Sequence, residues 1–389
     1  MYATAGLFPS KRRQPTRGKR RGGADDLARQ DSYLERVRIA LVSTPFVSVP
    51  PRGYGGTELV VHELQRGLAR AGHDVTLFAT GDSEGPDVRW LHERAAWPPN
   101  LEAEVAHARF AAEEIARDEF DLVHAHVPSM VAEAGRLGAP VVYTLHHVHE
   151  DRLSLLYRRA AGVRFVAISA RQAELEPSLR CHVVHHGLDP ERHPLGRGDG
   201  GYALFIGRLA WCKAPDVAAY AARAAGVDLV IAGAVHDEPT DPRGWKERLE
   251  RVLAGPGIRR VGNVQGERKF SLIGGARALI MPLRWEEPFG LVMIEAMLCG
   301  TPVIAFRRGS TPEVIDDGIT GFLVEDAAQM GEALRRVGEL DRSACRRRAR
   351  ERFSASRMVR DYLRVYHAAL AAAEPPWRPE PEGTRYAAS

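Results

Sequence analysis

Two glutamates, Glu287 and Glu295, have seven residues between them in the stretch RWEEPFGLVMIEAMLCGTPV. The segment LVMIEAML favours a helix, which places Glu287 in the loop before it and Glu295 about two turns inside it. Backbone N–H groups in the first turn of a helix attract anions, so a phosphate group can bind there. The carboxylates would then accept hydrogen bonds from sugar and ribose hydroxyl groups beside the phosphate. The alternative is that both are solvated surface charges.

Two cations, Arg208 and Lys213, follow an apolar run that reads YALFIG and is expected to form a strand. Arginine offers a bidentate fork and lysine a compact charge, so the pair suits a diphosphate and needs no metal ion. An earlier loop presents Gly55 and Gly56 just before an expected helix, at a strand end where open α/β sheets bind ligands. A plain tight turn is the alternative interpretation of these glycines.

Histidines gather where two predicted strands end: His124 and His126 at one, and His146, His147 and His149 at another. A single histidine in such a place is ordinarily a core or rim residue, but a cluster at neighbouring strand ends favours a functional site. Metal binding is the other possibility. The chain has no H-E-x-x-H or 2-His-carboxylate spacing, and its four cysteines show no C-x-x-C spacing, so we expect no metal site.

Apolar runs of strand length alternate with helical stretches along the chain, which predicts doubly wound parallel sheets of the α/β class. At 389 residues and 44% hydrophobic, the chain is long enough for two such domains. A linker rich in glycine and proline, residues 191–200, separates a first domain at 37–190 from a second at 201–355. Expected strands are 37–42, 74–79, 121–126, 141–146, 164–169, 202–207, 228–233, 258–263, 278–282 and 303–306, and expected helices include 59–71, 101–117 and 129–137.

The stretch from Arg284 to Val303 resembles the E-x7-E signature of the retaining glycosyltransferases of family 4, because FGLV lies between the glutamates and CGTPV follows them. YGGTE, DLVHAHVP, HHGLDP and GRLAWCK resemble further elements of that family, and they follow its order over nearly the whole chain after the first 36 residues. His186 stands where the family has Asn, and Trp211-Cys212 stands where it commonly has Pro-Glu. The resemblance implies a GT-B fold: two Rossmann-like domains face a cleft, and a C-terminal helix, here 356–375, crosses back onto the first domain.

The resemblance also implies a retaining hexosyltransferase without cofactor or metal, which moves a sugar from a nucleotide-diphosphate sugar to a hydroxyl acceptor on a glycan, lipid or small metabolite. It assigns the transferred sugar to Glu287, the ribose hydroxyls to Glu295, and the donor diphosphate to Arg208 and Lys213. His126 would face the sugar or acceptor, with His124 pointing back toward the sheet by alternation. The other donor-binding residues that it implies are Gly55, Gly56, Phe289, Gly290, Leu291 and Val292.

Three other functions stay open: a nucleotide-sugar epimerase of the same fold, an NAD-dependent oxidoreductase and a non-catalytic binding protein. The combination of G-R-L-x-x-x-K with E-x7-E argues against the epimerase. No G-x-G-x-x-G follows the first strand, which argues against the NAD enzyme. A binding protein would have no reason to keep Glu287, Glu295, Arg208 and Lys213 together.

The net charge of +4 is concentrated in a basic arm, residues 1–36, which contains KRRQPTRGKRRGG. Such composition favours a disordered, solvated tail over specific nucleic-acid binding, so at most peripheral membrane contact is expected of it. Residues 376–389 are expected to be disordered as well. Because the N-terminus lacks the apolar core of a signal peptide, no stretch suits a membrane span, and the cysteines suggest a reducing compartment, we expect a cytoplasmic protein.

Overall fold

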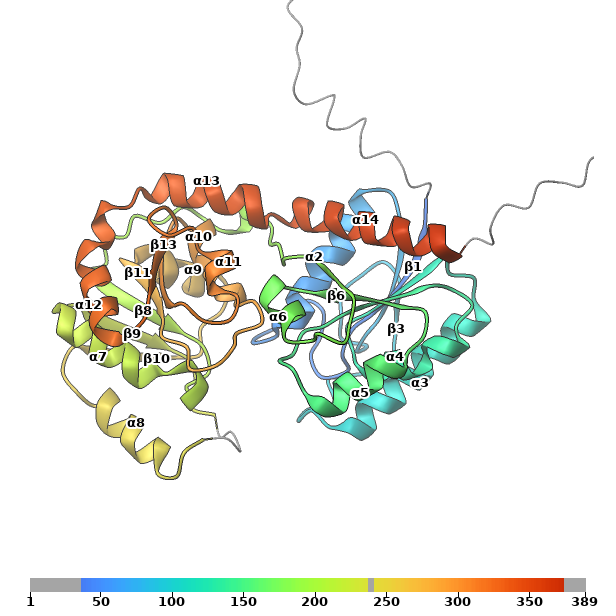
Figure 1. Ribbon diagram of the computed structural model, residues 1–389, viewed down its shortest axis with the longest axis horizontal. Coiled ribbons are helices and arrows are strands. Elements are labelled where there is room, and N and C mark those ends of the chain that lie inside the picture. The colour runs from blue at the N-terminus through green and yellow to red at the C-terminus, as the bar shows by residue number, and fades with distance from the viewer. Residues whose placement is uncertain (1–35, 237–240, 374–389) are drawn as a thin grey trace, which may run out of the picture. The chain divides into compact units, whose positions relative to one another are not determined.

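Two parallel sheets organise the chain in the computed structural model, which describes residues 36–236 and 241–373 (Figure 1). The first sheet has seven strands in the order β3-β2-β1-β4-β5-β6-β7. The central strands are apolar and buried along their length, as expected of parallel strands covered on both faces. The strands are β1 (Arg38–Val42), β2 (Asp74–Phe78), β3 (Val88–Arg89), β4 (Leu122–Ala125), β5 (Val141–Thr144), β6 (Val163–Ala167) and β7 (Cys181–Val183).

Helices cover both faces of this first sheet. One core joins Ala40 and Val123 of the sheet to Ala108, Met130 and Tyr157 of three helices on the same face. Figure 1 shows these three helices, α3, α4 and α5, below the sheet and α2 above it. The helices are α2 (Gly56–Arg70), α3 (Leu101–Arg117), α4 (Ser129–Glu133), α5 (Asp151–Arg159) and α6 (Ala170–Glu174), with short 3-10 turns at Ala134–Arg136 and Pro190–Arg192.

The second sheet has six strands in the order β10-β9-β8-β11-β12-β13, so β8 and β11 are neighbours at its centre. Its two faces bury separate cores, one against α9, α10 and α13 and the other against α7, α8 and α12. The strands are β8 (Tyr202–Ile206), β9 (Asp228–Ala232), β10 (Ile258–Gly262), β11 (Ala278–Met281), β12 (Val303–Phe306) and β13 (Gly321–Val324). The helices are α7 (Pro215–Ala225), α8 (Trp245–Leu253), α9 (Gly266–Gly275), α10 (Leu291–Leu298), α11 (Thr311–Val314), α12 (Ala327–Arg336) and α13 (Arg342–Phe353), with 3-10 turns at Trp211–Lys213 and Val337–Glu339.

The last helix, α14 (Ala355–Ala373), packs on the first sheet although it follows the second. Its Tyr366 hydroxyl lies 2.7 Å from His124 Nδ1, and its Tyr362 hydroxyl lies 3.0 Å from Thr144 Oγ1. A Cβ placed on Gly67 of α2 would lie 2.3 Å from Val359, so the two helices touch at a glycine. We call the first sheet with α2–α6 and α14 the N-terminal half, and the second sheet with α7–α13 the C-terminal half.

The sequence-based strands agree with the structure at the apolar runs and differ where that signal is weak. β3 has only two residues, and β7 is an edge strand in which His182 and Val183 are exposed, so neither produces a buried apolar run. The expected helix at 129–137 is α4 followed by a 3-10 turn. Most of the basic arm and the whole of the tail at 376–389 lie outside the described residues.

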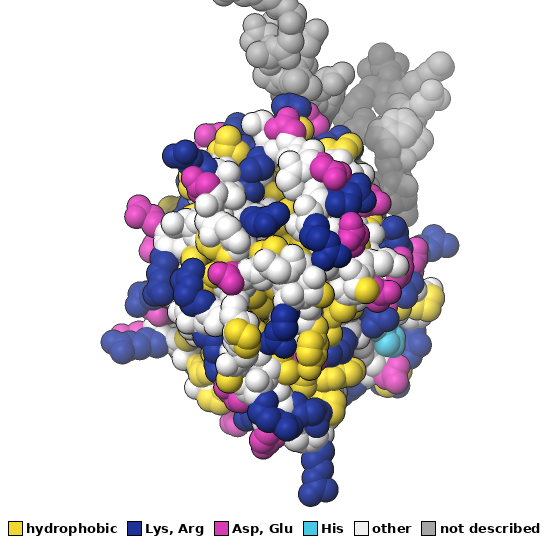
Figure 2. Space-filling view, turned by 90° about the vertical axis from the view of Figure 1, so that its left-hand side faces the viewer, with side chains coloured by type: hydrophobic (Ala, Val, Ile, Leu, Met, Phe, Trp, Pro, Cys, Tyr) yellow, Lys and Arg dark blue, Asp and Glu magenta, His cyan; other side chains and the backbone are white. Residues whose placement is uncertain are grey.

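The outer side of the C-terminal half carries lysine and arginine side chains with acidic side chains between them (Figure 2). Mixed charge of this kind is typical of a solvated surface. None of the helices in the described part of the chain is long and apolar enough to cross a membrane.

Candidate active site

The loop before α10 ends in a glycine that leaves the helix N-terminus open. Gly290 is the N-cap residue and has a φ of 79°, in the left-handed region that glycine adopts without strain. No side chain caps the first turn of α10. Met293 N–H bonds within the turn, to Gly290 O at 2.9 Å, which leaves the N–H groups of Leu291 and Val292 and the positive end of the helix dipole for an anion.

Glu287 lies in this loop and is paired with a cation. Its side chain is almost buried, at 8% exposure, and Oε2 forms an ion pair with Lys213 Nζ and accepts a hydrogen bond of 3.0 Å from Trp285 Nε1. The Lys213 ammonium also lies 4.4 Å from the centroid of the Trp285 ring, within the range of a cation–π contact. The structure thus brings two predicted site residues into one cluster and adds Trp285 to it.

The segment after β12 supports the Glu287 loop through its backbone. Ser310 donates its backbone N–H to Glu287 O at 2.9 Å and its hydroxyl to Phe289 O at 2.8 Å. Gly309 has a φ of 60°, and a Cβ placed on it would lie 2.3 Å from Glu287 N and 2.6 Å from Glu287 O. Only glycine therefore fits between this segment and the loop.

We expect Gly309→Ala to displace the Glu287 loop and to destabilise the protein. The control is Gly318→Ala, because Gly318 has a φ of 77° but no atom within 4 Å of its added Cβ. Both variants lose the glycine at a left-handed position, which costs about 1–2 kcal/mol, and only Gly309→Ala adds an overpacking cost of about 1–3 kcal/mol. Denaturant unfolding measures this difference. Equal free energies of unfolding for the two variants would contradict the described packing.

Glu295 lies inside α10 and is also paired with a lysine. It is 3% exposed, and its Oε1 is 2.6 Å from Nζ of Lys269, which belongs to α9. The pair explains how a carboxylate can be buried here, since an isolated buried charge would be costly. The sequence alone did not indicate Lys269 as a site residue, because its pairing with Glu295 depends on the contact between α9 and α10.

Arg208 lies two residues beyond β8 and is half-buried, and Lys213 ends the 3-10 turn that follows. Both therefore leave the carboxyl end of the central strand β8. The Glu287 loop leaves the carboxyl end of β11, the neighbour of β8, which explains why Lys213 reaches Glu287.

His124 and His126 at the end of β4 and His146 at the end of β5 form a row of rings, in which the first two are buried and His146 is half-buried. His126 is 2% exposed, and its Nδ1 lies 2.8 Å from His146 Nε2. Burial, and then the neighbouring imidazoles, hold the pKa of His126 well below its ordinary value. Burial also lowers the pKa of His124 and of His146 to about 3, so these rings are neutral near pH 7.

The two histidines of the DLVHAHVP motif have different surroundings. Both ring nitrogens of His124 are engaged, Nδ1 with Tyr366 and Nε2 with Thr144 Oγ1 at 2.8 Å, so this side chain fixes α14 on the sheet. His126 Nε2 is buried and has no hydrogen-bond partner within the described residues. Of the two histidines, His126 is therefore the one that keeps a ring nitrogen without a hydrogen bond to a described residue.

The row continues to the C-terminal half through His186, which follows β7. Its ring stacks on His146 at 5.4 Å between centroids and meets Phe289 edge to face at 5.0 Å. Through this ring contact Phe289, which is buried and precedes Gly290, packs against the N-terminal half. No role for His186 followed from the sequence, in which the pair of histidines in HHGLDP was the available signal.

The glycine loop of the N-terminal half lies opposite the start of α10. Gly55 is the N-cap of α2 and carries no side-chain cap. A Cβ placed on Gly56 would lie 3.4 Å from Leu291 Cδ1, so the structure brings Gly56 and Leu291 together. Val292 follows Leu291 in the open first turn of α10.

The described residues contain no group of three or more His, Cys, Asp or Glu side chains arranged to hold a metal ion.

Two family descriptions match the chain, one on each half. "Glycosyltransferase Family 4" matches residues 54–192, and "Glycosyl transferases group 1" matches residues 200–339, which include the Glu287 loop. The chain belongs to glycosyltransferase family 4. The predicted membership of this family is therefore confirmed.

Curated relatives of this family 4 glycosyltransferase match it over most of their length. A D-inositol 3-phosphate glycosyltransferase of Arthrobacter sp. (strain FB24) is 28% identical, over 87% of this chain and 96% of the relative. O-antigen chain mannosyltransferase C of Escherichia coli is 24% identical, over 81% of this chain and 95% of the relative.

Solved structures confirm the expected GT-B fold. The crystal structure of AviGT4, a glycosyltransferase involved in Avilamycin A biosynthesis, has a TM-score of 0.68 and 25% sequence identity, over 86% of this chain and 98% of that one. The two Rossmann-like sheets and the helix that returns to the first of them match the expected architecture.

Proposed function

We propose that this glycosyltransferase moves a sugar from a nucleotide-diphosphate sugar to a hydroxyl acceptor, with retention of the anomeric configuration and without a metal ion. The observation that carries the proposal is the buried Lys213–Glu287 pair next to the open N-terminus of α10. A cation, a carboxylate and a helix N-terminus in one place suit a ligand with a phosphate group beside hydroxyl groups.

The leaving diphosphate needs positive charge that is in place before the reaction. Lys213, Arg208 and the first turn of α10 provide such charge, and none of them has to be recruited from water. Since Lys213 also neutralises Glu287, the carboxylate can stay near the phosphate without repelling it strongly. Lys269 offsets the charge of Glu295 in the same way.

The two glutamates would bind different parts of the donor. Glu287 would accept hydrogen bonds from the transferred sugar, where positive charge develops at the anomeric carbon, while Glu295 would hold the ribose hydroxyls. His126 Nε2 would bond to a hydroxyl of the sugar or of the acceptor. We assign no nucleophile, and retention would follow from attack on the face that the diphosphate leaves, with the leaving phosphate accepting the proton of the acceptor.

The acceptor is proposed only as a hydroxyl group, because the names of the two curated relatives indicate different substrates, an inositol phosphate and an O-antigen chain. The decisive experiment screens the purified protein against nucleotide sugars by melting temperature, since a ligand bound only to the folded state stabilises it by mass action. Product analysis by NMR then reads the anomeric configuration. An inverted product, or an epimerised donor without transfer, would refute the proposal.

Sugar transfer is expected to survive removal of divalent cations. With EDTA present, the rate should stay within about twofold of the untreated rate, because the protein itself carries the charges that neutralise the leaving group. The rate of sugar transfer with and without EDTA, and after dialysis into Mg²⁺ or Mn²⁺, checks this. Complete loss in EDTA that either ion restores would contradict it.

A further inference from the structure

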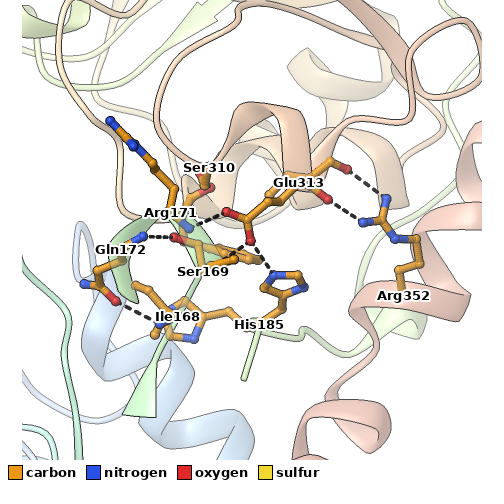
Figure 3. A network of polar contacts seen from close by, with 12 residues as sticks. Ile168, Ser169, Arg171, Gln172, His185, Ser310, Glu313 and Arg352 are labelled. Carbon is orange, nitrogen blue, oxygen red and sulfur yellow. Dashed lines mark hydrogen bonds and ion pairs between the residues drawn. The ribbon is translucent and has the colours of Figure 1, made fainter. Parts of the chain in front are cut away.

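The two halves are joined beside the active site by the carboxylate of Glu313, which belongs to α11 of the C-terminal half (Figure 3). It accepts hydrogen bonds from the backbone N–H groups of Ala170 at 2.6 Å and Arg171 at 2.7 Å, which open α6 of the N-terminal half. It also lies 3.0 Å from Nε2 of His185, in the segment after β7. A single carboxylate of one half thus binds two segments of the other.

The groups around Glu313 favour its charged form. Burial would raise its pKa, but the hydrogen bonds from His185 and from the N–H groups of Arg171 and Ala170 outweigh burial, and the pKa lies below its usual value. A negative charge at the first turn of α6 is also favourable toward the helix dipole. On its own side, the Glu313 carbonyl accepts a hydrogen bond from Arg352 of α13, which fixes α11 to the C-terminal half.

The same network reaches the Glu287 loop by two further contacts. Ser310, three residues before Glu313, holds the loop through Glu287 O and Phe289 O. Arg171 Nε donates a hydrogen bond of 2.9 Å to Glu286 Oε2, in the residue just before Glu287. The loop and α11 are therefore bonded both to each other and to the start of α6.

We propose that Glu313 is a positioning residue. It holds the Glu287 loop against the N-terminal half, and thereby places the sugar of the donor at reacting distance from the hydroxyl group of the acceptor. This inference rests on the proposed function for the role of Glu287. Glu313 itself bonds to protein groups and is given no contact with substrate.

The expected consequence is a loss of rate without a loss of nucleotide binding. The groups proposed to hold the diphosphate and the ribose, namely Arg208, Lys213, the first turn of α10 and Glu295, all belong to the C-terminal half. Nucleotide affinity should therefore depend little on the contacts of Glu313 with the N-terminal half. The reaction needs groups of both halves, and a displacement of about 1 Å can cost on the order of a hundredfold in rate. Glu313→Gln keeps the shape of the side chain but removes its charge and one of its acceptor oxygens.

The experiment compares Glu313→Gln with the control Glu332→Gln. Glu332 is an exposed glutamate of α12 whose hydrogen bonds, among the residues that the structure describes, go to Arg335 of the same helix. With the donor identified by melting temperature, kcat should fall roughly tenfold to a hundredfold in Glu313→Gln, and the Kd of UDP, GDP or ADP should stay within about twofold. Glu332→Gln should leave both unchanged.

A measurement that needs no substrate separates this inference from the proposed function. Spin labels at Arg158→Cys of α5 and Glu247→Cys of α8, both exposed, in a Cys181→Ser background, report the distance between the halves. The distribution should broaden in Glu313→Gln and not in Glu332→Gln. An unchanged distribution overturns the inference, and so does parent-like kcat or an equal loss of kcat and nucleotide affinity. If the protein transfers no sugar, the proposed function is wrong, but the distance measurement still tests whether Glu313 holds the two halves together.

A second variant covers the case in which Glu313→Gln does not fold. Arg171→Gln removes the bond to Glu286 but keeps the backbone N–H that Glu313 accepts. It should lower kcat severalfold and broaden the distance distribution, with nucleotide affinity as in the parent. A kcat and a distance distribution equal to those of the parent would overturn the inference.

Discussion

Replacing Glu287 by Gln is expected to lower kcat by roughly ten- to a thousandfold, the range for losing one preorganised electrostatic contact in a transition state. The amide keeps the size of the side chain but cannot offer a negative charge to the anomeric carbon. Glu295→Gln should instead raise the donor KM more than it lowers kcat, because a contact with the ribose acts equally in the ground and transition states. Steady-state kinetics of both single variants distinguishes the two roles.

Nucleotide affinity serves as the internal control for Glu287→Gln. Lys213 loses its counter-charge in this variant, so the Kd of the nucleoside diphosphate should stay the same or decrease while kcat falls. Local unfolding of the site would instead lower both kcat and the affinity for the nucleoside diphosphate. If the two glutamates were surface charges without a role, each replacement would change stability by less than about 0.5 kcal/mol and leave the kinetics alone. Parent-like rates in Glu287→Gln would remove the central claim about the site.

The alternation of apolar runs with helical stretches was sufficient to predict the two sheets. β9, for example, is the run DLVIA that the sequence marks as a buried strand. β3 could not be found in this way, because its two residues, Val88 and Arg89, form a strand only by pairing with β2. Its existence depends on a neighbour that is distant in sequence and not on a local pattern.

The site was predictable in its residue types but not in its pairs. Glu287 and Lys213 meet because β8 and β11 are adjacent in the sheet, and the order of strands cannot be read from periodicity. The Glu295–Lys269 pair depends likewise on the packing of α10 beside α9. The sequence indicated carboxylates and cations for one donor, and the fold determined which cation neutralises which carboxylate.

The contacts of Glu313 with the N-terminal half show a second feature that could not be predicted from the sequence. No site role was assigned to Glu313 from the sequence, and a glutamate in the first turn of a helix ordinarily serves its own helix. In the structure the carboxylate serves α6 of the other half, 143 residues away in sequence. Contacts between domains leave no periodic signal, because each involves only a few residues at loop ends.

Replacing Lys213 is expected to cost about 2–5 kcal/mol in kcat/KM and in nucleoside diphosphate binding, as for truncating one partner of a buried charge pair. Lys213→Met keeps an unbranched apolar side chain at this position and removes the ammonium group that lies over the Trp285 ring. The variant loses the attraction to the diphosphate and also leaves Glu287 charged and without its cation. Arg208→Ala should likewise lower kcat/KM and the affinity for the nucleoside diphosphate. Calorimetric binding of the nucleoside diphosphate and steady-state kinetics measure both losses.

The comparison variant is Lys269→Met, which also removes a lysine paired with a buried glutamate, here Glu295. Its pair lies at the expected ribose position, so the loss in diphosphate binding should be smaller. The double variant Lys213→Met/Glu287→Gln should deviate from the sum of its single variants by about 0.5–3 kcal/mol, because the residues are in contact. If Lys213→Met bound the nucleoside diphosphate as the parent does, the diphosphate would have to lie elsewhere, and the Lys213–Glu287 pair would be a structural ion pair only.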